Sequence, residues 1–90
     1  MILKLFAVVD RVSGLYDGPH KAVNKGQFLR SFSDTCGDPN SPVSKHPEDF
    51  YAVELGTYND ATGEVIGLDE GPVRVVDATE FVRKLKDEEK

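Results

Sequence analysis

The fold is decided by residues 44–58, which read SKHPEDFYAVELGTY. The first part has the composition of a helical turn: Pro47 suits its first position, and Glu48 and Asp49 suit the positive end of its dipole. From Phe50 to Tyr58 the side chains alternate, with Tyr51, Val53, Leu55 and Thr57 on one face. We therefore expect a turn that leads directly into a strand against which the rest of the chain can pack.

The second half of the chain continues this sheet. Residues 59–63, Asn-Asp-Ala-Thr-Gly, predict a hairpin loop with Gly63 in the left-handed conformation, and residues 64–68 predict the returning strand. Pro72 then precedes Val73–Val76, which we interpret as a short edge strand because proline is tolerated at the first residue of a strand.

The first half also begins with strands. Ile2–Asp10 is apolar on both faces apart from Lys4 and Asp10, which is typical of a central strand. The turn residues Asp10–Gly14 predict a reversal, and Leu15–Tyr16 a short second strand that Asp17-Gly18-Pro19 ends.

Two helices are expected. Asn24 and Gln27 have the spacing of a capping box, and the helix that they begin is expected to end at Gly37. Its apolar face consists of Phe28, Leu29, Phe32 and Cys36. Residues 40–45 are predicted to be a polar loop. A second capping box, Asp77–Glu80, begins a C-terminal helix whose apolar face is Ala78, Phe81, Val82 and Leu85 and whose last turn carries Arg83, Lys84 and Lys86.

These elements predict the fold class. We expect an α+β protein with one antiparallel-rich sheet of four to five strands and two helices packed on one face. Ninety residues suffice for one core, so residues 1–90 are expected to form a single domain, with residues 87–90 frayed.

The composition indicates the cellular compartment of the protein. No apolar run is long enough to cross a bilayer, and Lys4 interrupts an N-terminus that otherwise lacks the features of a signal peptide. Cys36 is the only cysteine, so no internal disulfide forms and a reducing compartment fits. We expect a cytoplasmic protein.

The charge is unevenly distributed along the chain. The formal net charge is −5, which argues against tight sequence-independent binding of nucleic acid. Residues 1–30 carry five basic and two acidic side chains, residues 31–60 one and six, and residues 61–90 five and eight. Any anion-binding face must therefore draw on the first third.

Cations and aromatic rings occur together in that third. Single-strand binders need cations along the phosphates and rings on which bases stack. The candidate nucleic-acid-binding residues are Lys4, Arg11, Tyr16, Lys21, Lys25 and Arg30. A solvated charged surface above a core that needs its aromatic residues explains the same pattern, and the sequence alone favours this alternative.

Other chemistry is weakly indicated. His46 with Glu48 and Asp49 offers ligand types for a metal, but the spacing matches no ligand pattern, and a turn with an acidic start explains it. Cys36 could pair with a histidine, yet it lies on an apolar stripe where a buried thiol is inert. No glycine loop for phosphate is present. We expect no catalytic residue, no metal and no cofactor, and hence no enzyme.

Several motifs together resemble one family. They are the opening Leu3–Val8, Phe32-Ser33-Asp34, Asp38-Pro39-Asn40, Ser44–Phe50, Leu55-Gly56 and Asp60–Glu64. In these motifs the chain resembles the small non-structural protein of gokushoviruses, which are single-stranded-DNA phages of the microvirus group. That viral protein is often labelled phage open-reading-frame-five protein. The resemblance covers roughly residues 1–66 and has no matching motif after Gly67.

The resemblance implies a non-structural accessory protein in an infected bacterial cell. Its expected place is the switch from double-stranded replication to single-strand synthesis and packaging, with no catalytic residues to transfer. Two hypotheses follow. The first is weak binding of single-stranded DNA through the basic first third. The second is a protein-interaction module without DNA binding that acts on replication or procapsid proteins and uses the acidic hairpin or an unpaired strand edge. Either form could be a homodimer.

Overall fold

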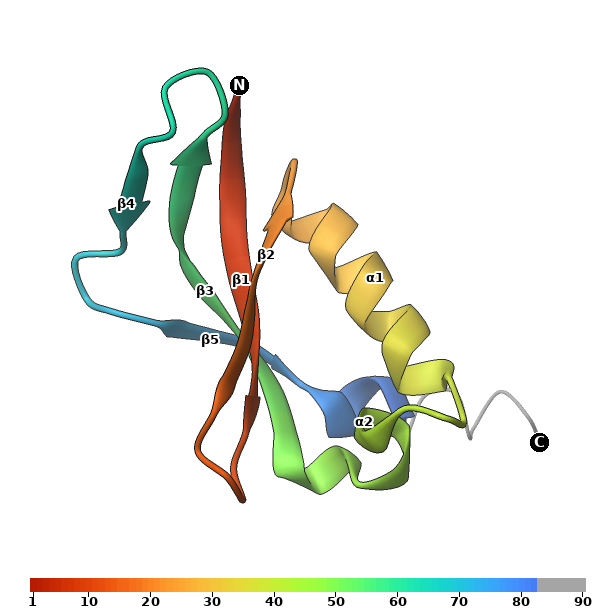
Figure 1. Ribbon diagram of the computed structural model, residues 1–90. Coiled ribbons are helices and arrows are strands. Elements are labelled where there is room, and N and C mark those ends of the chain that lie inside the picture. Colours follow the sequence, from red (N-terminus) through yellow and green to blue (C-terminus); the bar gives the residue numbers. More distant parts are fainter. Residues whose placement is uncertain (83–90) are drawn as a thin grey trace.

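The computed structural model describes residues 1–82 and consists of one antiparallel sheet with helices on one of its faces (Figure 1). The elements in chain order are β1 (Ile2–Asp10), β2 (Tyr16–Ala22), α1 (Lys25–Gly37), α2 (Pro42–Lys45), the 3₁₀ turn η1 (Pro47–Asp49), β3 (Phe50–Asn59), β4 (Val65–Gly67) and β5 (Val73–Asp77). Residues 78–82 are again helical. The predicted α+β class is confirmed.

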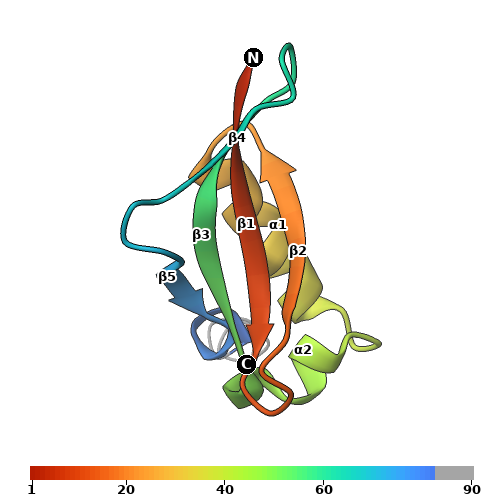
Figure 2. The ribbon, with the colours of Figure 1, turned by 60° about the vertical axis from the view of Figure 1, so that its left-hand side comes forward.

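β1 and β3 form the centre of the sheet. β3 pairs with β1 from Phe50 to Asn59, and the opposite edge of β3 pairs first with β5 and then with β4. β2 lies outside β1 and is an edge strand. Figure 2 shows β3, β1 and β2 side by side, with α1 and α2 behind them.

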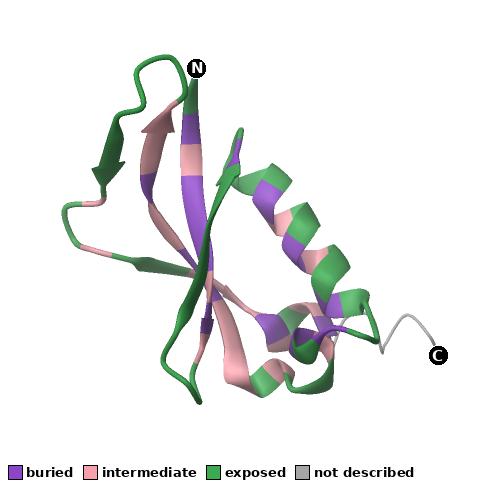
Figure 3. Ribbon diagram, viewed as in Figure 1, coloured by how far each residue is buried: buried purple, intermediate pink, exposed green. Residues whose placement is uncertain are grey.

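The main core lies between the sheet and the helices. Phe6 of β1 stacks on Phe28 of α1 with ring centroids 4.3 Å apart, and Phe28 is followed by Phe32 at 6.0 Å. The rings of Phe32 and Phe81 then form a T-shaped pair with centroids 6.0 Å apart. This row of aromatic rings joins both predicted helices to β1, and Ala52 of β3 packs against it. Burial is concentrated in β1 and the inner side of α1, while β2 and β4 are almost fully exposed (Figure 3).

Local signals explain most element boundaries. Asn24 Oδ1 accepts a hydrogen bond from the Gln27 N–H at 2.9 Å, and Gln27 Oε1 accepts one from the Val23 N–H at 2.7 Å, as the capping box predicts. The Asn59–Gly63 hairpin is confirmed, and Gly63 has φ +79°. The C-terminal helix begins at residue 78 as expected; Leu85, its last-turn cations and the tail 87–90 lie outside the described residues.

Two predictions about the first half of the chain are wrong. β2 does not end at Asp17-Gly18-Pro19 but continues to Ala22. It tolerates Pro19 because two residues, Gly18 and Pro19, lie opposite Ala7 in a bulge, and because an edge strand has no second neighbour for the missing N–H. Residues 40–45 are not all loop, since α2 begins at Pro42 with Ser41 as its N-cap. The Ser41 hydroxyl accepts a hydrogen bond from the Val43 N–H at 3.1 Å.

Three glycines of β3, β4 and their connecting loop differ in what an added Cβ would meet and in whether their backbone is strained for other residues. At Gly56, φ is +156° and a Cβ would lie 2.0 Å from the carbonyl oxygen of Ile66, because the backbone of the paired strand β4 approaches closely here. At Gly63 the backbone is left-handed but a Cβ would meet nothing within 4 Å. At Gly67 a Cβ would meet only the Leu55 carbonyl oxygen, at 3.9 Å.

We expect alanine substitutions at these positions to destabilise the protein in a graded series. Gly67→Ala should have little effect, Gly63→Ala should cost about 1 kcal/mol through backbone strain, and Gly56→Ala should cost about 2 kcal/mol or more because strain and a backbone clash add. Urea unfolding measures the series. Equal stability of the Gly56→Ala and Gly67→Ala variants would contradict the pairing of β3 with β4.

Candidate functional site

The sheet has one face that none of the described helices covers, which we call the open face (Figure 1). Its centre is a small apolar cluster of Ala7, Val9 and Val53, with Tyr51 and Leu55 packed against it. These residues lie on β1 and β3, where alternate side chains point away from α1. Polar side chains at one end of this face form the candidate site.

The candidate site is a cluster of two arginines, a tyrosine and an aspartate, which we call the Arg11 cluster: Arg11, Tyr51, Arg74 and Asp77. The guanidinium carbons of Arg11 and Arg74 lie 4.5 Å and 5.0 Å from the centre of the Tyr51 ring. Arg11 Nη2 is 2.6 Å from Asp77 Oδ1, and Arg74 Nη2 is 3.6 Å from the same oxygen. The cluster therefore places two cations beside one ring and one carboxylate.

A bulge in β5 assembles this cluster. Tyr51 pairs with Asp77, and Val53 pairs with Arg74, so two steps along β3 match three steps along β5. In a regular strand Arg74 and Asp77 would point to opposite faces, because their spacing is odd. β5 has one extra residue opposite the step from Ala52 to Val53. This residue changes the direction of the side chains beyond it, so that Arg74 and Asp77 both lie on the open face.

The two arginines have different freedom. Arg11 is held at both ends: Nη1 donates to the Glu48 carbonyl oxygen at 2.8 Å, Nη2 donates to Asp77, and its backbone N–H donates to the Asp49 carbonyl oxygen at 2.8 Å. Arg74 lies against the Tyr51 ring, its ion pair with Asp77 is longer than that of Arg11, and its side chain is 55% exposed. Arg11 thus has a mainly structural position, whereas Arg74 keeps donors available to a ligand.

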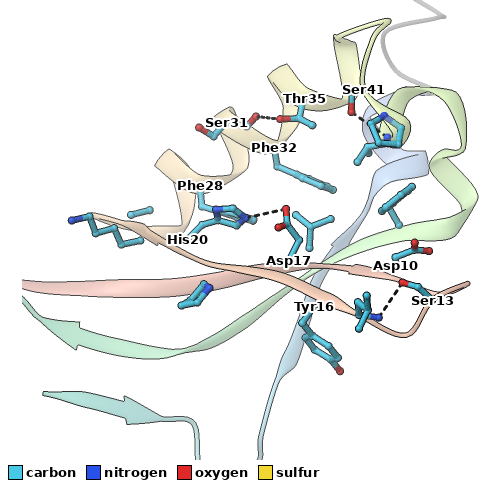
Figure 4. Close-up of a pocket in the computed structure, with 18 of the residues that line it drawn as sticks. Asp10, Ser13, Tyr16, Asp17, His20, Phe28, Ser31, Phe32, Thr35 and Ser41 are labelled. Carbon is cyan, nitrogen blue, oxygen red and sulfur yellow. Dashed lines mark hydrogen bonds and ion pairs between the residues drawn. The ribbon is translucent and has the colours of Figure 1, made fainter. Parts of the chain in front are cut away.

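Tyr16 borders the same end of the open face. A shallow cleft of about 420 Å³ is lined by Arg11, Tyr16, Tyr51, Val53, Pro72 and Arg74. Tyr16 is 52% exposed, and Figure 4 shows its ring on the side of the sheet away from Phe28 and Phe32. An exposed ring beside an exposed guanidinium that keeps donors available is the combination that a base and its phosphate require.

The six residues predicted from the sequence do not form one surface. Tyr16 pairs with Val9 and Lys21 with Leu5, so both side chains share the open face with the Arg11 cluster. Lys4 alternates with Leu3 and Leu5 on β1 and points to the face that α1 covers. Lys25 and Arg30 are exposed on α1, in the other layer of the molecule. Three of the six residues therefore lie on the open face.

Sequence reasoning missed Tyr51 and Arg74. The alternation in residues 50–58 puts Tyr51 on one face of a strand but assigns it no role in binding, and Arg74 lies outside the basic first third. A recognisable signal existed, since Tyr51 and Val53 share a face and would meet whichever side chains of a neighbouring strand pointed the same way. The bulge that directs Arg74 to them has no signal in the sequence.

A second hollow lies on the opposite side of β2, between this edge strand and α1 (Figure 4). This groove has a volume of about 1120 Å³. Its walls include Val8, Phe28 and Phe32, with Asp17, His20, Ser31 and Thr35 among its polar residues. His20 Nε2 lies 3.6 Å from Asp17 Oδ2, and both side chains are exposed. The groove combines apolar walls with the outer edge of β2, which pairs with no strand among residues 1–82.

The chain belongs to a known protein family. Its architecture is that of a small α+β protein with an antiparallel sheet whose open face carries a cluster of arginine and tyrosine. The family model described as Phage ORF5 protein matches residues 3–81, so this is a bacteriophage protein of the ORF5 family. The match extends past Gly67, where the motifs of the sequence end, and includes β5 with Arg74 and Asp77. No curated protein and no solved structure matches the chain.

Cys36 is not a reactive group. Its side chain is 1% exposed within the main core, and burial raises the pKa of the thiol from 9.0 to about 11 because a thiolate loses its solvation there. The prediction of a buried thiol is confirmed. No histidine lies in the group of buried residues that surrounds it.

This pKa shift predicts a loss of stability in alkali. The folded state keeps the neutral thiol while the unfolded state ionises, so the contribution is complete below about pH 9 and is lost as the pH approaches 11. The loss is on the order of 2 kcal/mol. Urea unfolding of the wild type and of Cys36→Ala between pH 8 and pH 11 should show a free-energy difference that shrinks with pH. A difference independent of pH would contradict it.

Proposed function

We propose that this phage protein is a non-structural accessory protein that binds single-stranded DNA weakly through the open face. The observation that supports this most is the Arg11 cluster beside Tyr16, because it offers an exposed guanidinium, that of Arg74, and an exposed ring within one cleft. Membership of a phage family supplies the setting. The proposed stage is the switch from double-stranded replication to single-strand synthesis and packaging.

Each side chain has a distinct role in this proposal. Arg74 contacts a phosphate with the donors that Asp77 leaves free, and Tyr16 stacks on a base. Lys21, on the same face of β2, contacts a phosphate further along the strand. Tyr51 and Arg11 support the site, since Tyr51 lies against both guanidinium groups and Arg11 connects η1 to β5.

The same geometry explains why binding is weak. Arg11 already has hydrogen-bond partners, and Asp77 competes with phosphate for Arg74. The chain as a whole has a net charge of −5, so no long-range attraction adds to these few contacts. A duplex hides the faces of its bases from Tyr16, so single strands should be preferred.

We expect salt and mutation to separate the phosphate contacts from stacking. Arg74→Ala should flatten the slope of log affinity against log salt by about 0.7, the value for one phosphate contact of a single strand. Tyr16→Ala should cost about 1–3 kcal/mol and leave that slope nearly unchanged. Fluorescence anisotropy with single- and double-stranded oligonucleotides across a salt series measures both effects.

Arg30→Ala is the matched control, because Arg30 is an exposed arginine of α1 in the other layer. The open-face proposal predicts no change for this variant, whereas the set of residues derived from the sequence predicts a flatter slope. If the wild type shows no salt-dependent binding at low ionic strength, the DNA-binding proposal is wrong.

The groove between β2 and α1 supports a second candidate function, a protein-interaction module. The backbone of β2 has no partner strand on its outer edge within residues 1–82, and Leu15, 70% exposed, lines the groove at the β1–β2 turn. An exposed leucine beside an apolar groove is suited to a contact with another protein. The proposed partners are phage replication or procapsid proteins, or a second copy of the chain.

Light scattering tests this candidate. We expect a mass above 9.9 kDa at high protein concentration, or a shift when phage replication or procapsid proteins are added. Leu15→Asp should abolish the shift, and Val65→Asp should preserve it, because Val65 is similarly exposed, at 63%, but lies on β4 away from the groove. A monomer that no added phage protein shifts would argue against the interaction.

A further inference from the structure

The turn η1 adjoins the Arg11 cluster through the backbone contacts of Arg11 and brings three potential metal ligands together, none of which lines the groove. Each of His46, Glu48 and Asp49 offers one ligand atom, an imidazole nitrogen or a carboxylate oxygen, and these atoms all lie within 4.8 Å of one another. His46 and Glu48 are exposed and Asp49 is half-buried. The spacing in the sequence did not indicate this convergence; the conformation of the turn creates it.

The backbone of this turn is held on both sides. The His46 N–H donates to the Pro42 carbonyl oxygen at 2.9 Å, and the Asp49 N–H donates to the His46 carbonyl oxygen at 3.0 Å. From the other side, Arg11 donates to the carbonyl oxygens of Glu48 and Asp49, each at 2.8 Å. The carbonyl oxygens are thus engaged with the protein, and only side-chain rotations are needed to adjust the three ligand atoms.

The three side chains have no cationic partner within residues 1–82. None of the ion pairs in this part of the chain includes His46, Glu48 or Asp49. Two carboxylates at this separation repel each other, and a shared cation would replace that repulsion with attraction. The dipole of a helical turn explains two acidic residues at its start, but it gives no reason for an imidazole nitrogen to join them.

We propose that His46, Glu48 and Asp49 bind a divalent transition-metal ion of the zinc class. One nitrogen and two carboxylate oxygens suit Zn²⁺ or Co²⁺, whereas Mg²⁺ and Ca²⁺ prefer oxygen ligands alone. Zinc–ligand bonds of about 2.0–2.2 Å allow ligand atoms on one ion to be up to about 4.4 Å apart, so small rotations of exposed side chains suffice. Water completes the coordination.

Isothermal titration with Zn²⁺ and with Mg²⁺ tests the site on the untagged protein. We expect Zn²⁺ to bind at one site at least roughly a hundredfold more tightly than Mg²⁺, and Zn²⁺ to raise the thermal unfolding midpoint. His46→Ala, Glu48→Gln and Asp49→Asn should each weaken Zn²⁺ binding by roughly tenfold or more. Visible absorption of the Co²⁺ form should report a nitrogen ligand that His46→Ala removes.

His20→Ala is the matched control, because His20 is the other histidine of the chain and also has a carboxylate nearby, that of Asp17. It should leave Zn²⁺ affinity unchanged. Unfolding midpoints measured in EDTA establish that all variants are folded. Equal affinity of the wild type and His46→Ala, or an equal loss in His20→Ala, would show adventitious binding only, and either result would overturn the proposal. The outcome is independent of DNA binding.

Discussion

The rest of the structure depends on how β3 shares its outer edge between two strands. Along one side β3 pairs with β1 over its whole length, and along the other it pairs with β5 near its start and with β4 near its end. Gly56 lies within the pairing with β4, where a Cβ would collide with the backbone at Ile66. The close approach of β4 is therefore possible only with glycine at this position.

Bulges then determine what each face of the sheet presents. One residue is inserted in β2 opposite Ala7, one in β3 opposite β1, and one in β5 opposite β3. Each insertion changes which side chains point to the helices and which to the open face. The one in β5 places Arg74 beside Tyr51, and the one in β2 carries the edge strand past Pro19. Both candidate surfaces thus result from irregular pairing.

Arg11 connects the two functional proposals structurally. Its guanidinium contacts Tyr51 and Asp77 on the open face, and the same side chain, with its backbone N–H, holds the carbonyl oxygens of η1. Removing it would alter the open face and the turn together. For this reason Arg74 and His46, rather than Arg11, are the residues at which the binding of nucleic acid and of metal can be examined separately.

The amino-acid sequence alone predicts the elements that local chemistry controls: β1, the capped helix α1, the hairpin at Gly63, the turn at Pro47 and the α+β class. These depend on periodicity, capping and glycine, which act over a few residues. Residues 15–22 and Arg74 show where prediction from the sequence fails. Whether Pro19 lies in a strand, which face Arg74 occupies and how far apart the six predicted residues lie depend on register and bulges between distant segments. Only the tertiary structure decides these, because one inserted residue reverses the direction of every side chain beyond it.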